Sequence, residues 1–98
     1  MSFAEHVAAD CRLIILRALA QEIDQQLNET ILVAILETFG HRKSRDYVRT
    51  QLRRLEDLDA VRLTEAGSIL VATLRRAGLD HVQRRALLEG VGVPSPEA

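Results

Sequence analysis

The chain is poor in the residues that build disulfide frameworks, cysteine-based metal centres and base-stacking surfaces. Cys11 is the single cysteine among 98 residues, so neither an internal disulfide nor a metal site built on several cysteines can form. Its place on the apolar side of a predicted helix favours a small core residue over a reactive thiol. Phe3, Phe39 and Tyr47 are the only aromatic residues. This scarcity argues against single-strand nucleic-acid binding, which relies on aromatic stacking.

The chain also lacks a membrane signal and a catalytic motif. No apolar run approaches the length needed to span a bilayer, and the early polar residues Glu5 and His6 do not fit a signal peptide. We therefore expect a cytoplasmic protein. The three histidines, His6, His41 and His81, lie in different segments, and no P-loop, H-E-x-x-H, G-x-S-x-G or G-x-G-x-x-G motif occurs. The sequence thus predicts no enzyme, no cofactor and no metal.

Positive and negative charges nearly balance over the chain, but the positive ones are concentrated in one stretch. The formal net charge is −1, yet residues 41–54 hold six cationic side chains and one acid, Asp46. Lys43 is the only lysine, and arginine binds phosphates and guanine edges bidentately. A near-neutral chain with one basic face fits a DNA-binding protein. A coding bias toward arginine is the competing explanation.

Residues 44–58 are predicted to form an amphipathic helix around which the rest of the chain is organised. Ser44 is a good N-cap. One row of side chains with helical spacing is apolar and should face a core: Val48, Leu52 and Leu55. A second row, spaced by four residues, is cationic: Arg45, Arg49 and Arg53.

Two further helices are predicted before this one. Ser2 and Glu5 form a capping-box pattern that opens a helix ending near Ala20. Residues 21–27 are polar without helical periodicity and are interpreted as a connection. Asn28 is the next N-cap, and Gly40 ends that helix because glycine readily takes the left-handed conformation. The helix, short turn and basic helix that follow are typical of a helix-turn-helix.

The pattern changes from helical to alternating after Leu58. Residues 61–64 and 69–74 read as two strands of a β-hairpin around a turn at residues 65–68. Residues 75–85 are predicted to form a last helix, in which Gly78 is unfavourable. We therefore predict a mainly α fold with a small β-hairpin (α+β), a winged helix-turn-helix with three helices, two strands and a final helix. The domain would span residues 1–86, followed by an extended tail at 87–98.

The first helix is apolar on more than one side, because Leu13 and Leu16 lie off its main apolar stripe. Such a helix is either central to the core or pairs with another chain. A chain this short buries only about 60–65% of its unfolded surface, so dimerisation would stabilise it. We expect a homodimer through this helix, with a possible contribution from the C-terminal segment; a purely intrachain role is the alternative.

Several stretches resemble a known family. The opening MSFAEHVAADCRLIILRAL, the segment around Leu27 and Asn28, and above all FGHRKSRDYVRTQL are similar to a small uncharacterised protein of Mu-like transposable phages and prophages. The resemblance extends through VATLRRAGLDHV. It implies a winged-helix fold and a phage or prophage origin, and it implies no particular activity.

The leading hypothesis from the sequence is binding of double-stranded DNA, in transcriptional regulation or phage DNA handling. The residues expected to contact DNA are Arg42, Lys43, Ser44, Arg45, Arg49, Thr50, Arg53 and Arg62. Arg45 and Arg49 are the best candidates for guanine edges, and Thr50 could contact a thymine methyl group. The alternative is a protein-interaction adaptor in phage packaging or assembly, with the arginine row facing acidic groups.

Overall fold

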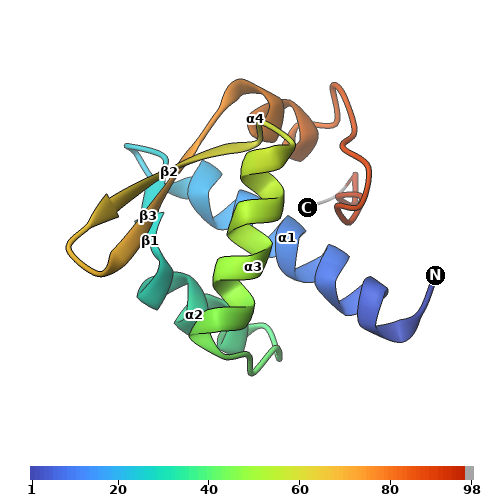
Figure 1. The fold of residues 1–98 in the computed structure, drawn as a ribbon. Coiled ribbons are helices and arrows are strands. Elements are labelled where there is room, and N and C mark those ends of the chain that lie inside the picture. Colours follow the sequence, from blue (N-terminus) through green and yellow to red (C-terminus); the bar gives the residue numbers. More distant parts are fainter. Residues whose placement is uncertain (97–98) are drawn as a thin grey trace.

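The computed structural model describes residues 1–96 and has four helices and one three-stranded antiparallel sheet. The α+β class predicted from the sequence is confirmed. In chain order the elements are α1 (Phe3–Gln21), β1 (Gln26–Asn28), α2 (Glu29–Thr38), α3 (Arg45–Asp57), β2 (Val61–Ala66), β3 (Ile69–Leu74) and α4 (Arg76–Val82) (Figure 1).

Local capping signals set the starts of the first three helices, as predicted. Ser2 and Glu5 form the reciprocal capping box of α1. The side chains of Asn28 and Ser44 each accept a hydrogen bond from the backbone N–H three residues later, at 2.9 and 3.1 Å. Gly40 follows α2 with φ of +91°, a backbone conformation that glycine adopts without steric cost.

The sequence prediction missed β1. Residues 26–28 lie in or beside the stretch interpreted as a connection, but they pair antiparallel with β3, with Leu27 opposite Ala72. The sheet order is therefore β1-β3-β2. A three-residue strand is too short to show alternation in the sequence. It forms because it can pair with the edge of β3, where Ala72, opposite Leu27, lies 45 residues further along the chain. The predicted order of elements is wrong in this respect.

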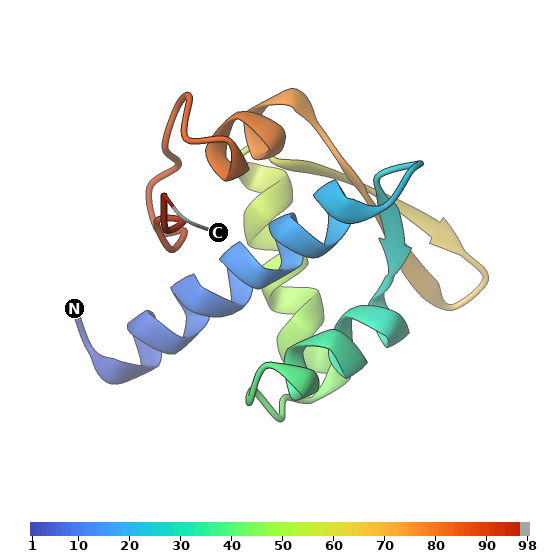
Figure 2. The ribbon, with the colours of Figure 1, turned by 180° about the vertical axis from the view of Figure 1, so that it is seen from behind.

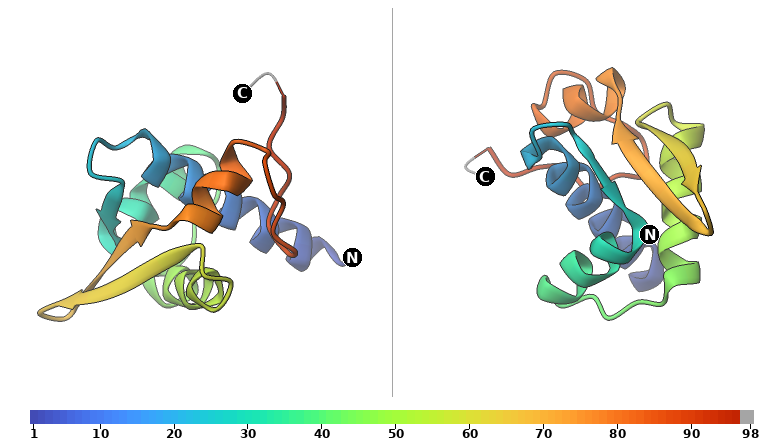
Figure 3. Two further views of the ribbon diagram at one scale, coloured as in Figure 1. Left: turned by 90° about the horizontal axis from the view of Figure 1, so that it is seen from above. Right: turned by 90° about the vertical axis from the view of Figure 1, so that its left-hand side faces the viewer.

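The β2–β3 hairpin is confirmed, with a longer first strand than predicted. Ala66 pairs with Ile69, which leaves a two-residue turn of Gly67 and Ser68. Gly67 has φ of +63°, and glycine at the first position of a two-residue turn is typical of type II′. The hairpin projects from the body beside α3 (Figures 1 and 3).

Helix α1 is the central support of the fold. It contacts α2, α3, α4, β1 and β3, and it crosses the back of the molecule (Figure 2). Its inward side chains, including Cys11, Ile15, Leu16 and Leu19, have no exposed surface. Cys11 is thus a buried core residue, as predicted. No helix within residues 1–96 is both long and apolar enough to cross a membrane.

The last helix is shorter than predicted, and the chain after it packs against α1. Helix α4 ends at Val82, and Arg84 has φ of +61°, which is incompatible with a continuing right-handed helix. Val91 is buried, and the Gly92 N–H donates to the Ala9 carbonyl at 3.0 Å.

Buried His81 fixes the path of this C-terminal segment. Its Nδ1 accepts a hydrogen bond from the Leu88 N–H at 2.9 Å, so its Nε2 carries the proton and donates to the Gly92 carbonyl at 2.8 Å. Beyond α4, residues 83–96 contain no helix or strand. Residues 97 and 98 of the predicted tail lie outside the described residues.

Candidate nucleic-acid interface

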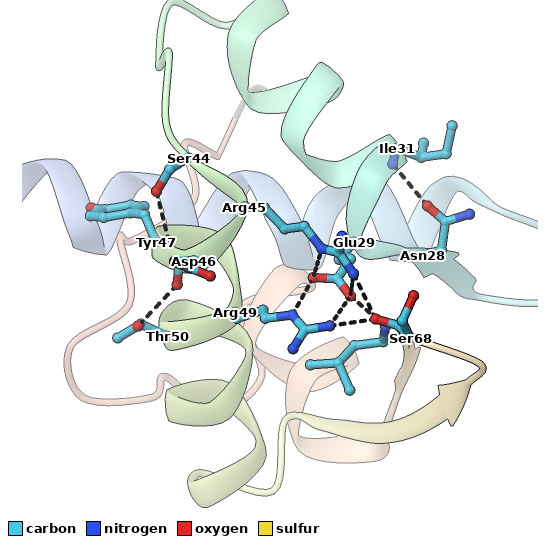
Figure 4. A network of polar contacts seen from close by, with 11 residues as sticks. Asn28, Glu29, Ile31, Ser44, Arg45, Asp46, Tyr47, Arg49, Thr50 and Ser68 are labelled. Carbon is cyan, nitrogen blue, oxygen red and sulfur yellow. Dashed lines mark hydrogen bonds and ion pairs between the residues drawn. The ribbon is translucent and has the colours of Figure 1, made fainter.

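Helix α3 presents three distinct surfaces. Val48, Leu52 and Leu55 are completely buried and dock the helix on the core, as their spacing predicts. Opposite them, one exposed surface combines two acids, one cation and one hydroxyl: Asp46, Thr50, Arg53 and Asp57. A flanking surface carries Arg45 and Arg49, which point toward the start of α2 and the β2–β3 turn (Figure 4).

A buried carboxylate receives both of these arginines. Glu29, the first residue of α2, has no exposed surface. The Arg49 Nε and its terminal nitrogen donate to the two Glu29 oxygens at 2.6 and 2.9 Å. The Arg45 Nε lies 3.1 Å from the same carboxylate. The arrangement on Arg49 is bidentate, the stronger geometry for an arginine–carboxylate pair.

The same cluster binds the β-hairpin to the two helices. The Ser68 carbonyl accepts a hydrogen bond of 2.6 Å from each arginine, and the Leu70 N–H donates to Glu29 at 2.5 Å. We call Glu29, Arg45, Arg49 and the Ser68 carbonyl the arginine clamp. It joins α2, α3 and the turn between β2 and β3, elements that are separated along the chain, and so fixes the hairpin relative to α3.

The hydrogen bonds of the clamp determine the protonation of Glu29. They lower the pKa of its carboxyl group from 4.5 to about 2. The Arg49 side chain contributes most, burial opposes the shift, and the Leu70 N–H and Arg45 lower the pKa further. Glu29 in turn raises the pKa of Arg49. The clamp is therefore fully ionised near neutral pH, with two positive charges around one negative charge.

Acid should lower the stability of the fold by protonating the Glu29 carboxyl group. A carboxyl group whose pKa is lowered by folding stabilises the protein fully above its unfolded pKa and loses that contribution as the pH falls toward its folded pKa. Because both arginines are partly exposed, we expect a loss of about 2–3 kcal/mol in unfolding free energy between roughly pH 5 and pH 2. Urea unfolding across this range should show the loss in the native chain. Glu29→Gln should lack this part of the pH dependence; an unchanged profile would contradict the assignment.

The structure divides the eight predicted contact residues into two groups. Arg45 and Arg49, the predicted readers of guanine edges, are engaged in the clamp, with side chains 47% and 34% exposed. Ser44 caps α3, and the Thr50 hydroxyl donates to the Asp46 carbonyl at 3.1 Å. The remaining cationic side chains lie outside the clamp, three of them exposed and Lys43 half-buried: Arg42, Lys43, Arg53 and Arg62.

Sequence reasoning missed Glu29 and Ser68 as partners of the arginine row. Glu29 has the pattern of an ordinary first-turn acid, and the arginines that bind it lie 16 and 20 residues away. Ser68 contributes a backbone carbonyl, which no residue type signals. An acid directly after the Asn28 N-cap was the available cue, but its pairing depends on how α2 and α3 pack.

No other arrangement among residues 1–96 suggests a catalytic or metal centre. No group of three or more His, Cys, Asp or Glu side chains there could hold a metal ion. One hollow, of about 470 Å³, lies between α1 and α2, and most of its exposed lining surface is apolar. It contains no residue of the predicted interface.

These features define a small α+β domain in which a buried ion-pair cluster holds two adjacent helices and a β-hairpin together. Over 89 residues the chain is 38% identical to a protein of Escherichia phage Mu described as "Uncharacterized protein gp26", covering 91% of this chain and 92% of that protein. The chain therefore belongs to the family of phage Mu gp26, and its phage or prophage origin is supported.

A second relative comes from a bacterial genome. A protein of Haemophilus influenzae described as "Uncharacterized protein" is 46% identical over 57 residues, which cover 58% of this chain and 55% of that protein. No protein-family model matches the chain, and no solved structure matches it.

Proposed function

We propose that this chain is a winged-helix protein that binds double-stranded DNA, in transcriptional control or in phage DNA handling. The supporting observation is the position of α3: it follows α2 after a short basic turn, lies beside the β2–β3 hairpin, and exposes the side opposite its buried leucines. In helix-turn-helix proteins the second helix of such a pair enters the major groove. The hairpin would correspond to the wing.

Four cations outside the clamp would make the phosphate contacts. No hydrogen bond or ion pair within residues 1–96 engages the side chain of Arg53 or Arg62. Arg42 lies 3.9 Å from Glu37 but is 88% exposed, and such a surface pair is weak. The Lys43 ammonium lies 4.8 Å from the centre of the Tyr47 ring. These four side chains can therefore contact a polyanion without breaking a buried interaction.

Arg45 and Arg49 receive a different role in this proposal from the one that their spacing predicts. Reading a guanine with Arg49 would require breaking its bidentate bond to buried Glu29, which would remove the strongest partner of a buried carboxylate. We assign both arginines to positioning the hairpin beside α3. Arg45 is nearly half exposed, so its free edge can still approach a phosphate.

The salt dependence of duplex binding tests this assignment. Four phosphate contacts predict that log affinity falls against log salt with a slope of about −3 to −4 per subunit. The double variant Arg53→Glu with Arg62→Glu should lose binding to random duplex at low salt by at least roughly tenfold. Fluorescence anisotropy with a labelled duplex measures both quantities.

A matched control separates contact from overall charge. Arg76→Glu with Arg85→Glu changes the net charge by the same amount on and just after α4, where both arginines lie beside Asp80 at 3.3 Å. We expect this variant to bind duplex more tightly than the α3–β2 variant. Equal losses in both variants, or no duplex binding by the native chain at low salt, would overturn the proposal.

A protein-interaction adaptor in phage packaging or assembly is the second candidate. Two observations favour it: the clamp engages the central arginines of the row internally, and the outward surface of α3 carries Asp46 and Asp57 beside Arg53. Acidic groups at the centre of the surface oppose a close approach of phosphates. Absence of duplex binding by the native chain at low salt would support this candidate.

A further inference from the structure

The outward surface of α1 is a continuous stripe that other elements cover only in part. Its members recur at helical spacing along the 19-residue helix: Phe3, Val7, Asp10, Ile14, Arg17 and Gln21. Figure 2 views this side directly and shows the first turns of α1 extending beyond the body. Phe3 is 83% exposed. A helix side with apolar residues open to water is typical of an interaction surface.

An apolar groove adjoins this stripe. It has a volume of about 470 Å³ and lies between α1 and α2. Leu13, Ile14 and Ala18 line it from α1, and Ile35 and Phe39 from the other side. Phe39, at the end of α2, is 65% exposed. The stripe and the groove together form one apolar surface with a few charges within it.

The charges on this surface are arranged so that the surface complements itself. Asp10 and Arg17 are equidistant along α1 from the midpoint between Leu13 and Ile14. The Arg17 side chain has no hydrogen bond or ion pair within residues 1–96. Asp10 uses one oxygen to bind His41 Nε2 at 2.7 Å and is 55% exposed, so its other oxygen is available.

We infer that this surface binds a second copy of the chain, with the two α1 helices antiparallel around a two-fold axis near Ile14. Such an axis brings Asp10 of each copy to Arg17 of the other, giving two equivalent ion pairs, as an isologous interface requires. Near the axis the apolar contact comes from Ile14 of both copies, and Ala18 adds to it beyond each Arg17. At the ends, exposed Phe3 approaches the exposed Ile23 of the second copy.

The two-fold axis also determines where the two α3 helices lie. Helix α1 lies behind α3 in the molecule (Figures 1 and 3). Pairing through the back of α1 therefore places the two α3 helices on opposite outer sides of the dimer. If the DNA-binding proposal holds, the dimer would connect two duplex segments rather than read two adjacent half-sites of one duplex. This consequence rests on the proposed function; the dimer itself does not.

Charge exchange tests the interface. The native chain should sediment near 22 kDa, twice its 11.0 kDa mass, at micromolar concentrations. Arg17→Asp should raise the dimer dissociation constant at least roughly tenfold, because it sets two carboxylates against each other at both ends of the axis. Adding Asp10→Arg should restore dimerisation to within about threefold of the native constant, since each pair is then re-formed with its charges exchanged.

Three outcomes would overturn the inference: a native chain that stays at 11.0 kDa up to several hundred micromolar, an Arg17→Asp variant that dimerises like the native chain, or a double variant that is no better than the single one. Circular dichroism of each variant shows whether it is folded, and Glu65→Lys, at an exposed position on β2 away from this surface, serves as a charge control. A duplex immobilised on a surface should retain a second, labelled duplex through the dimer. If the labelled duplex is not retained although the chain still dimerises, the result contradicts the DNA-binding proposal and leaves the dimer inference standing.

Discussion

Glu29→Ala is expected to lower the free energy of unfolding by about 2–4 kcal/mol. The substitution leaves the Leu70 N–H without its buried acceptor and removes the carboxylate that holds Arg45 and Arg49. The two arginines are partly exposed and can be solvated, which keeps the loss below that of a fully buried pair. Chemical denaturation monitored by circular dichroism measures the change.

The exposed pair between Glu37 and Arg42 supplies the control. Its atoms are 3.9 Å apart and both side chains are more than half exposed, so Glu37→Ala should change stability by less than roughly 0.5–1 kcal/mol. Comparable losses in the two variants would mean that the clamp is no stronger than an ordinary surface contact.

The clamp also determines how charge reversal on α3 should be interpreted. Arg49→Glu would bring a second carboxylate against buried Glu29, and like charges in a buried site are strongly destabilising. Loss of duplex binding by that variant would therefore report unfolding and not a missing DNA contact. Arg53 and Arg62 are the informative positions because their side chains lie outside the clamp.

Gly78→Ala is expected to lower the free energy of unfolding by roughly 1–3 kcal/mol. A β-carbon at this position would lie 2.4 Å from the Ala60 carbonyl oxygen and 2.7 Å from a methyl group of Leu74. The first of these contacts is with backbone, which cannot move aside alone. Helix propensity alone predicts the opposite sign, a gain of about 1 kcal/mol for alanine over glycine.

The two effects at Gly78 can be separated by measurement. Ala77→Gly, one residue earlier in α4, changes helix propensity without adding an atom and should cost about 0.5–1 kcal/mol. If Gly78→Ala instead stabilised the protein in thermal or urea unfolding, the close approach between α4 and Ala60 would be wrong. Glycine is thus required here by packing, whereas the sequence alone presents it as an unfavourable helix residue.

Features that depend on neighbours in the chain were predictable. Ser2, Asn28 and Ser44 mark the starts of three helices because each side chain bonds a backbone N–H only three residues away. The buried row of α3 follows from helical periodicity. The hairpin follows from the alternation in residues 61–64 and the apolar, β-branched run at residues 69–74. These are local effects, so a single stretch of sequence contains their cause.

Features that depend on distant partners were not predictable. Strand β1 forms only because β3 lies beside it, and α4 ends early because the chain turns back at Arg84 to pack on α1. The arginine row illustrates the difference most clearly. Its spacing correctly places Arg45 and Arg49 together on one side of α3. The spacing does not indicate the carboxylate on α2 that the two arginines bind.

The sequence by itself determined the first three helices, their N-caps, the hairpin and the apolar side by which α3 docks, because each arises from residues within a few positions of one another. Only the tertiary structure decided which cations are held internally and which extend outward. That division depends on Glu29, Arg49 and the Ser68 carbonyl meeting in space. A buried carboxylate must be paired to remain charged, and its partners come from whichever elements the packing of the core places beside it.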